Sequence, residues 1–128
     1  MESFVLSIYE QENIEEKDST TILRTVPFER GFHFSTPTGA YTGISALSLQ
    51  DFADKLITVD AESIEFHYYR GDFQRWIDNT LGDRDFANQL CFIQRDFSGE
   101  QLRRELGRLL DKRITDLKGL KWVETEGI

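Results

Sequence analysis

Hydrophobic residues recur at helical spacing in the middle of the chain. After Ser48, five apolar residues stand at i, i+3, i+4, i+7 and i+8: Leu49, Phe52, Ala53, Leu56 and Ile57. This spacing puts all five on one stripe of a helix. Ser48 is placed as the N-cap, with Asp51 as its capping-box-like partner. The pattern predicts a helix that buries the whole stripe.

A longer apolar stripe runs toward the C-terminus. Ser98 and Gln101 are spaced as a capping box. The residues of the stripe that follows are Leu102, Leu106, Leu109, Leu110, Ile114 and Leu117. They predict one continuous helix. Gly107, inside this helix, costs roughly 1 kcal/mol relative to alanine, a cost that a close crossing with another element would offset.

Aspartates and glycines divide the chain between these two helices. The aspartates are placed as N-caps and the glycines as helix ends: Asp60, Asp72, Asp83, Gly71 and Gly82. Phe73 and Trp76 follow the Arg70-Gly71-Asp72 step and are predicted to anchor the core. The aromatic segment around this step is therefore interpreted mainly as a corner between helices.

The first third of the chain has strand character. FVLSIY (4–9) and TTILRTV (20–26) are rich in β-branched and aromatic residues, and residues 32–35 alternate between apolar and polar. The segment TPTGAYTG (36–43) has the composition of a turn-forming loop. Together the patterns predict an α+β fold, in which a small N-terminal antiparallel sheet of two or three strands packs against a C-terminal bundle of four or five helices. We expect one domain over residues 1–128, mainly β over 1–35 and mainly α over 48–118.

Composition and charge narrow the classes of partner. Of 128 residues, 39% are hydrophobic and 30% charged, which is typical of a globular chain. The net charge of −8 argues against nucleic acid or an anionic membrane as partner. Residues 98–121 nevertheless carry seven Lys or Arg against four Asp or Glu, and Arg104, Arg108 and Lys112 form a like-charge row. The acidic remainder of the chain can oppose this row internally.

Cysteine usage and the start of the chain bear on the compartment. Cys91 is the only cysteine, so no intramolecular disulfide can form, and its neighbours Leu90 and Phe92 predict an inert core thiol. The opening sequence lacks the basic region of a secretory signal, and no apolar run has the length of a membrane span. These features predict a cytoplasmic protein.

Candidate chemistry centres on His67. A histidine can act as a general base near neutral pH, and Asp72 or Glu65 is placed to orient it. Its aromatic neighbours favour instead a partly buried residue that bonds to the backbone or to a tyrosine. His33 is distant in sequence, and the chain has no zinc-binding histidine motif, nucleophile elbow or phosphate loop. No catalytic residue, metal or cofactor is predicted.

Two surface segments are candidates for binding a ligand. An exposed Tyr41, next to the hydroxyl of Thr42, can stack on a polar ligand such as a sugar and hydrogen-bond to it. The helix corner offers His67, Arg70 and Asp72. If these five residues converge, they would line a cleft between the 36–43 loop and the 67–72 corner.

Three parts of the chain resemble a known family: FHFSTPTGAYTG, Ser48-Leu49 with Phe52 and Leu56, and SIEFHYYRGDFQRWIDNTLGD. Together they resemble an uncharacterised family of small archaeal and bacterial domains of unknown function. The resemblance covers roughly residues 31–117, and its most specific part is the aromatic-His segment followed by DFQRWI and LGD. It implies a prokaryotic domain, offers no catalytic residues, and carries a faint association with proteins that act on carbohydrates.

The leading functional hypothesis is a non-catalytic binding or protein-interaction domain of a prokaryotic cytoplasmic protein. The alternative is a protein or enzyme that holds a small ligand, such as a carbohydrate, in the cleft described above. A third hypothesis is an oligomer formed through an exposed apolar face. The partner, the ligand and the oligomeric state do not follow from the sequence.

Overall fold

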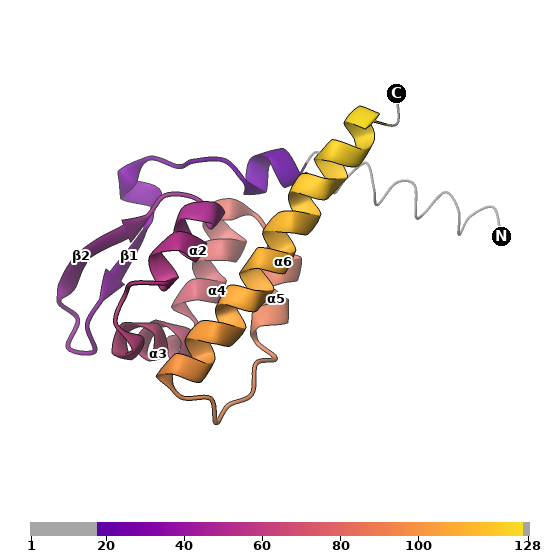
Figure 1. Cartoon of the computed structure of the whole chain (residues 1–128). Coiled ribbons are helices and arrows are strands. Elements are labelled where there is room, and N and C mark those ends of the chain that lie inside the picture. The colour runs from indigo at the N-terminus through magenta and orange to yellow at the C-terminus, as the bar shows by residue number, and fades with distance from the viewer. Residues whose placement is uncertain (1–17, 127–128) are drawn as a thin grey trace.

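A computed structural model describes residues 18–126, with side-chain positions up to residue 119 (Figure 1). The elements in chain order are a helix over residues 18–22, the 3-10 turn η1 (Phe28–Arg30), β1 (Phe32–Ser35), β2 (Tyr41–Ala46), α2 (Leu49–Leu56), α3 (Ala61–Arg70), α4 (Asp72–Trp76), the π-helical turn η2 (Ile77–Leu81), α5 (Arg84–Leu90) and α6 (Gly99–Glu126). The predicted α+β fold is confirmed. In Figure 1 the β-hairpin and α6 lie on either side of the shorter helices.

The two strands form an antiparallel hairpin. Phe32 pairs with Ala46 and Ser35 with Tyr41, with an irregular register between these pairs. Phe34 is fully buried, so the alternation predicted for residues 32–35 is confirmed. The loop predicted over residues 36–43 is wrong at its C-terminal end, because residues 41–43 belong to β2. The turn ends at Ala40, whose carbonyl accepts a hydrogen bond from the N–H of Thr36.

The strand predicted at residues 20–26 is wrong, and the strand predicted at 4–9 lies outside the described residues. Residues 18–22 are helical, and the N–H of Leu23 donates to the carbonyl of Ser19. Ile22 and Val26 are both 3% exposed and join the core. Ile22 lies in the helix and Val26 in the segment after it, where its N–H donates to the carbonyl of Leu47, so contacts with distant residues override the strand propensity of this segment.

Most of the predicted helix signals hold. The Oγ of Ser48 accepts from the N–H of Asp51, Asp83 accepts from the N–H of Phe86, and the side-chain amide oxygen of Gln101 accepts from the N–H of Ser98. Gly71 and Gly82 both take the left-handed conformation that ends a helix, with φ of 79° and 85°.

Two predicted caps do not form. Asp60 precedes α3 without a capping bond from its side chain. Asp72 is the first residue of α4, whose N-cap is Gly71, because the Asp72 carboxylate is engaged by other side chains.

One hydrophobic core joins the hairpin to the helices. Phe73 and Trp76 are 0% and 8% exposed, which confirms them as core anchors. The indole N–H of Trp76 donates to the carbonyl of Arg30 and so fastens η1 to the bundle. The whole predicted stripe of α6 is buried: Leu102, Leu106, Leu109, Leu110, Ile114 and Leu117.

Candidate binding groove and the predicted site residues

His67 lies in the core beneath the hairpin and is 5% exposed. Its Nε2 accepts a hydrogen bond from the backbone N–H of Ser35 over 2.8 Å, and its Nδ1 lies 2.9 Å from Oδ2 of Asp72. A ring nitrogen that accepts a hydrogen bond carries no proton, so the ring is neutral and Nδ1 donates to Asp72. The interpretation of His67 as a buried residue bonded to the backbone is confirmed.

The surroundings of His67 favour this neutral form. Burial lowers the pKa of His67 from its ordinary value of 6.5, although the hydrogen bond with Asp72 opposes the shift. The ring packs against the rings of Phe32 and Phe73, with centroids 4.8 and 5.7 Å away. Both ring nitrogens, which a general base would use, are engaged inside the fold. In this arrangement His67 fastens α3 to β1.

The carboxylate of Asp72 gathers several cationic groups at the corner between α3 and α4. It contacts His67, Arg75 and Arg70, with Oδ2 lying 3.3 Å from Nε of Arg70. The guanidinium of Arg70 also lies over the ring of Phe66, 4.6 Å from its centroid. Three of the five predicted ligand-binding residues therefore lie together, as an ion-pair cluster.

Tyr41 and Thr42 lie on β2, and their hydrogen bonds go to other residues of the hairpin and not to this cluster. The Tyr41 side chain is on the outer face of the hairpin, where its hydroxyl lies 2.6 Å from Oγ of Ser45, which in turn is 2.7 Å from Nδ1 of His33. The hydroxyl of Thr42 donates to the carbonyl of Phe34. His67 meets the hairpin from the inner face, so the outer-face Tyr41 does not converge with it. Ligand binding by these residues stays a prediction.

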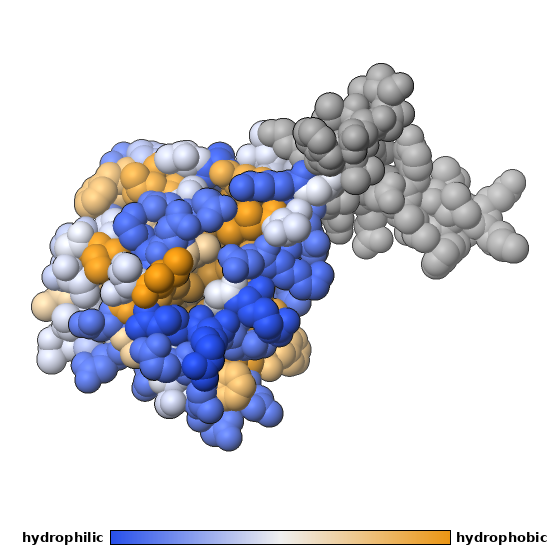
Figure 2. Space-filling model, viewed as in Figure 1, coloured by the Kyte–Doolittle hydropathy of each residue, from blue (hydrophilic) through white to orange (hydrophobic). Residues whose placement is uncertain are grey.

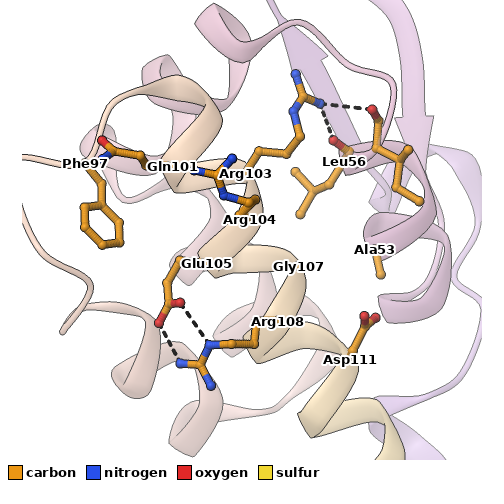
Figure 3. A pocket seen from close by; sticks show the side chains of 11 residues that line it. Ala53, Leu56, Phe97, Gln101, Arg103, Arg104, Glu105, Gly107, Arg108 and Asp111 are labelled. Carbon is orange, nitrogen blue, oxygen red and sulfur yellow. Dashed lines mark hydrogen bonds and ion pairs between the residues drawn. The ribbon is translucent and has the colours of Figure 1, made fainter.

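A groove between α2 and α6 is the largest hollow among those described, about 760 Å³. Ala53, Leu56 and Ile57 line it from α2 and the residue that follows, Phe97 from the loop before α6, and Gly107 from α6. Figure 3 shows Phe97 near one end of the groove and Ala53 with Asp111 near the other. Figure 2 shows hydrophobic patches bordered by hydrophilic residues on the face that α6 crosses.

Two residues open this groove. Ile57 was predicted to be buried with the α2 stripe, but it is 72% exposed because α2 ends at Leu56 and Ile57 is its C-cap. A close crossing would offset the cost of Gly107, but a Cβ added there would meet no atom within 4 Å. The absent side chain therefore leaves space on the groove floor instead of admitting another element.

Arginines and acids surround the apolar lining. Arg103 donates to the carbonyls of Leu56, the last residue of α2, and of Ile57, its C-cap, and also pairs with Glu100. These bonds satisfy carbonyls that a helix end otherwise leaves without partners. Arg103 thus fixes the end of α2, and with it the position of Ile57, against α6.

The like-charge row predicted on the last helix is opposed mainly within the helix itself. Arg108 forms two hydrogen bonds to Glu105, which lower the pKa of the Glu105 carboxyl, and Lys112 pairs with Asp116. Between residues 18 and 119, Arg104 forms no ion pair or side-chain hydrogen bond. Glu100, one turn earlier, attracts Arg104 without forming an ion pair or a hydrogen bond with it.

The sequence contains a partial signal for the groove. Thr58 and Asp60 mark the end of the helix just after Ile57, so an apolar residue at this boundary has no following turn to cover it. A glycine within a strong helical stripe also signals either a close contact or a gap. Only the packing of α2 on α6 distinguishes these alternatives.

Other candidate chemistry is limited within the described region. Cys91 is exposed, so the prediction of a core thiol is wrong; at the end of α5 Leu90 is buried, whereas Cys91 and Phe92 after it are exposed. Cys91 lines a second hollow of about 580 Å³ together with Arg70 and Arg95. Between residues 18 and 126, no cluster of three His, Cys, Asp or Glu is placed to hold a metal ion. Over the same residues, no helix is both long and apolar enough to cross a membrane.

Comparison with known proteins identifies the family. The profile of DUF5752, described as a family of unknown function, matches residues 29–127. The chain belongs to the DUF5752 family. The suspected relationship to an uncharacterised domain family is thus confirmed, and the DUF5752 match begins just before β1 and includes both sides of the groove. Searches of the curated proteins and of the solved structures gave no match.

Proposed function

We propose that this DUF5752 chain is a non-catalytic protein-interaction domain of a prokaryotic cytoplasmic protein, and that the groove between α2 and α6 binds a helical segment of its partner. The observation that carries the proposal is the hollow lined by both Ile57, which is 72% exposed, and Gly107, where an added Cβ meets nothing within 4 Å. Hollows lined mainly by apolar side chains are the usual places where proteins hold a ligand or a partner helix.

The dimensions of the groove suit a helix. On the α6 side the lining extends from Gln101 to Asp111, which is about 15 Å of helix by the usual rise per residue. A partner helix of two to three turns would cover this length, in the way that amphipathic helices lie in hydrophobic grooves. Full burial of the Ile57 side chain would contribute about 2 kcal/mol to binding.

Peptide selection with a matched variant tests this proposal. A displayed library of random peptides is selected on the native chain, and the enriched peptides are then tested for binding to Gly107→Leu, whose side chain would fill the groove. Gly119→Leu, another substitution on α6 where an added Cβ meets nothing within 4 Å, is the control. We expect enriched peptides to bind the native chain and the Gly119→Leu variant but not the Gly107→Leu variant. If all enriched peptides bind the three proteins equally, the groove is not the interaction site.

A second candidate function is small-ligand binding on the outer face of the hairpin. Tyr41 and Phe28 are 52% and 57% exposed, and the ring of His33 lies between them, with centroids 5.9 and 4.7 Å away. Such a row of rings, with the Ser45 hydroxyl beside it, suits a polar ligand with one apolar face, such as a carbohydrate.

Titration with mono- and oligosaccharides tests this second candidate. Binding by the native chain that is lost in Tyr41→Ala and kept in Gly107→Leu would support the hairpin face. Binding that is unaffected by Tyr41→Ala would exclude it as the site.

A further inference from the structure

The charges around the groove are not equivalent. Arg103 is engaged by Glu100 and two backbone carbonyls, and Arg108 by Glu105. Among residues 18–119, two groove-lining charges form no ion pair or side-chain hydrogen bond, Arg104 and Asp111. One cation and one carboxylate are thus left to interact with an occupant.

These two charges lie on one face of α6, toward opposite ends of the groove. Arg104, Gly107, Arg108 and Asp111 stand at i, i+3, i+4 and i+7, which places them on the groove side of the helix. Figure 3 shows Arg104 toward the end marked by Phe97, and Asp111 toward the end marked by Ala53. Seven residues of helix separate the two charges by about 10 Å, with the open floor at Gly107 between them.

We infer that the occupant is an amphipathic helix that carries a carboxylate and a cation about two turns apart, on either side of an apolar centre. This inference rests on the proposed interaction function and adds the charge pattern of the partner. The carboxylate of the partner lies against Arg104 and its cation against Asp111, while apolar side chains fill the space above Gly107. The order of the charges also sets the direction in which the partner helix lies, because the reverse direction brings like charges together.

Defined peptides test the inference. The probe is a labelled, end-capped helical peptide of about 14 residues, with a leucine stripe flanked by one Glu and one Lys two turns apart. Its partner probe has Gln at both charged positions. Affinities are measured by fluorescence polarisation on the native chain and on Arg104→Gln, Asp111→Asn and Gly107→Leu, with Gly119→Leu as the control.

We expect the charged peptide to bind the native chain several-fold more tightly than the Gln peptide, because each exposed ion pair contributes a factor of about 1.4 to 5. Arg104→Gln and Asp111→Asn should each lower the ratio of the two affinities by weakening the charged peptide, without changing the affinity for the Gln peptide. Added salt should reduce the ratio in the native chain. Gly107→Leu should weaken both peptides by at least tenfold and leave the helical circular dichroism intact.

The outcomes separate the inference from the proposed function. Equal affinity of the two peptides, with both lost in Gly107→Leu, overturns the charge pattern and leaves the groove as a binding site. Binding of both peptides to Gly107→Leu at native affinity, or binding of neither peptide to the native chain at millimolar concentration, overturns the groove itself. A native dimer in light scattering that becomes a monomer in Gly107→Leu shows that a second copy occupies the groove, which also overturns the inference.

Discussion

Replacement of His67 by alanine tests whether this residue holds the fold together. The backbone N–H of Ser35 donates to Nε2 of His67, and its removal leaves a buried donor without a partner, which costs about 1–3 kcal/mol. The lost ring also contacts Phe32, Phe34 and Phe73, and the resulting cavity adds about 2 kcal/mol. We expect His67→Ala to lower the free energy of unfolding by about 3–5 kcal/mol.

Urea unfolding followed by tryptophan fluorescence measures this change, because Trp76 is buried in the same core. His67→Gln is the matched variant, since its amide can offer an acceptor to Ser35 and fills more of the space. We expect it to lose less stability than His67→Ala. A loss below about 1 kcal/mol in His67→Ala, measured at pH 7.5, would refute the structural role.

The pH dependence of the free energy of unfolding provides a second test of the structural role of His67. Because burial lowers the pKa of His67 from 6.5 in the folded chain, the unfolded chain binds the proton more readily. The contribution of His67 to stability is therefore fully present above pH 6.5 and is lost as the pH falls from there toward the folded-state pKa. The slope for this one group is at most about 1.4 kcal/mol per pH unit. Identical slopes for the native chain and His67→Gln between pH 7 and pH 5.5 would contradict the assignment.

Substitutions at three further positions have defined expectations in the same unfolding assay. Asp83→Ala removes both the cap of α5 and the two hydrogen bonds that Asp83 accepts from Arg113, so we expect a loss of about 3–5 kcal/mol, with a smaller loss in Asp83→Asn. Gly107→Ala should increase stability by up to about 1 kcal/mol, because alanine favours the helix and its methyl group meets no neighbour; a decrease would show that the groove floor is closed. Gly71→Ala should destabilise by about 1 kcal/mol, because φ at this position is 79°, and an unchanged midpoint would contradict that conformation.

Local signals in the sequence were sufficient for most of the helical part. Ser48, Asp83 and Gln101 act through bonds to residues only three positions away, and the α6 stripe needs only a regular helix with one buried side. Gly71 and Gly82 end helices through their own backbone conformation. Such features follow from neighbouring residues, so the boundaries they predict agree with the structure.

Features that depend on distant contacts were predicted less well. Residues 20–26 have strand propensity, but Ile22 and Val26 pack on the bundle instead of pairing with a strand. The start of β2 was predicted as a loop, because the threonines and glycines of residues 36–43 are common in loops. The same residues also occur in strands with an irregular register, as β2 has here. Asp72 is of a residue type that commonly caps helices, but its carboxylate is hydrogen-bonded to His67, which precedes Gly71 in the sequence.

The candidate site shows the same division. His67, Arg70 and Asp72 are close in sequence and lie together, whereas Tyr41 lies on the opposite face of the hairpin. The groove depends on how two helices more than forty residues apart pack at Ile57, as the bond from Arg103 to its carbonyl illustrates. Periodicity predicts each helix but contains no information on where the two leave a space between them.

The arginines that complete helix ends from afar also have a consequence for synthesis of the chain. The carbonyl of Leu56 at the end of α2 accepts a hydrogen bond from Arg103, which is 47 residues later in the sequence. The carbonyl of Thr80 in η2 accepts one from Arg24, which is 56 residues earlier. While the ribosome is still making α6, those parts of the apolar surfaces of α2, α3 and α5 that pack on α6 are uncovered. The nascent chain therefore reaches its native state only after its last helix emerges, and until then it presents chaperones with the surface that α6 later covers.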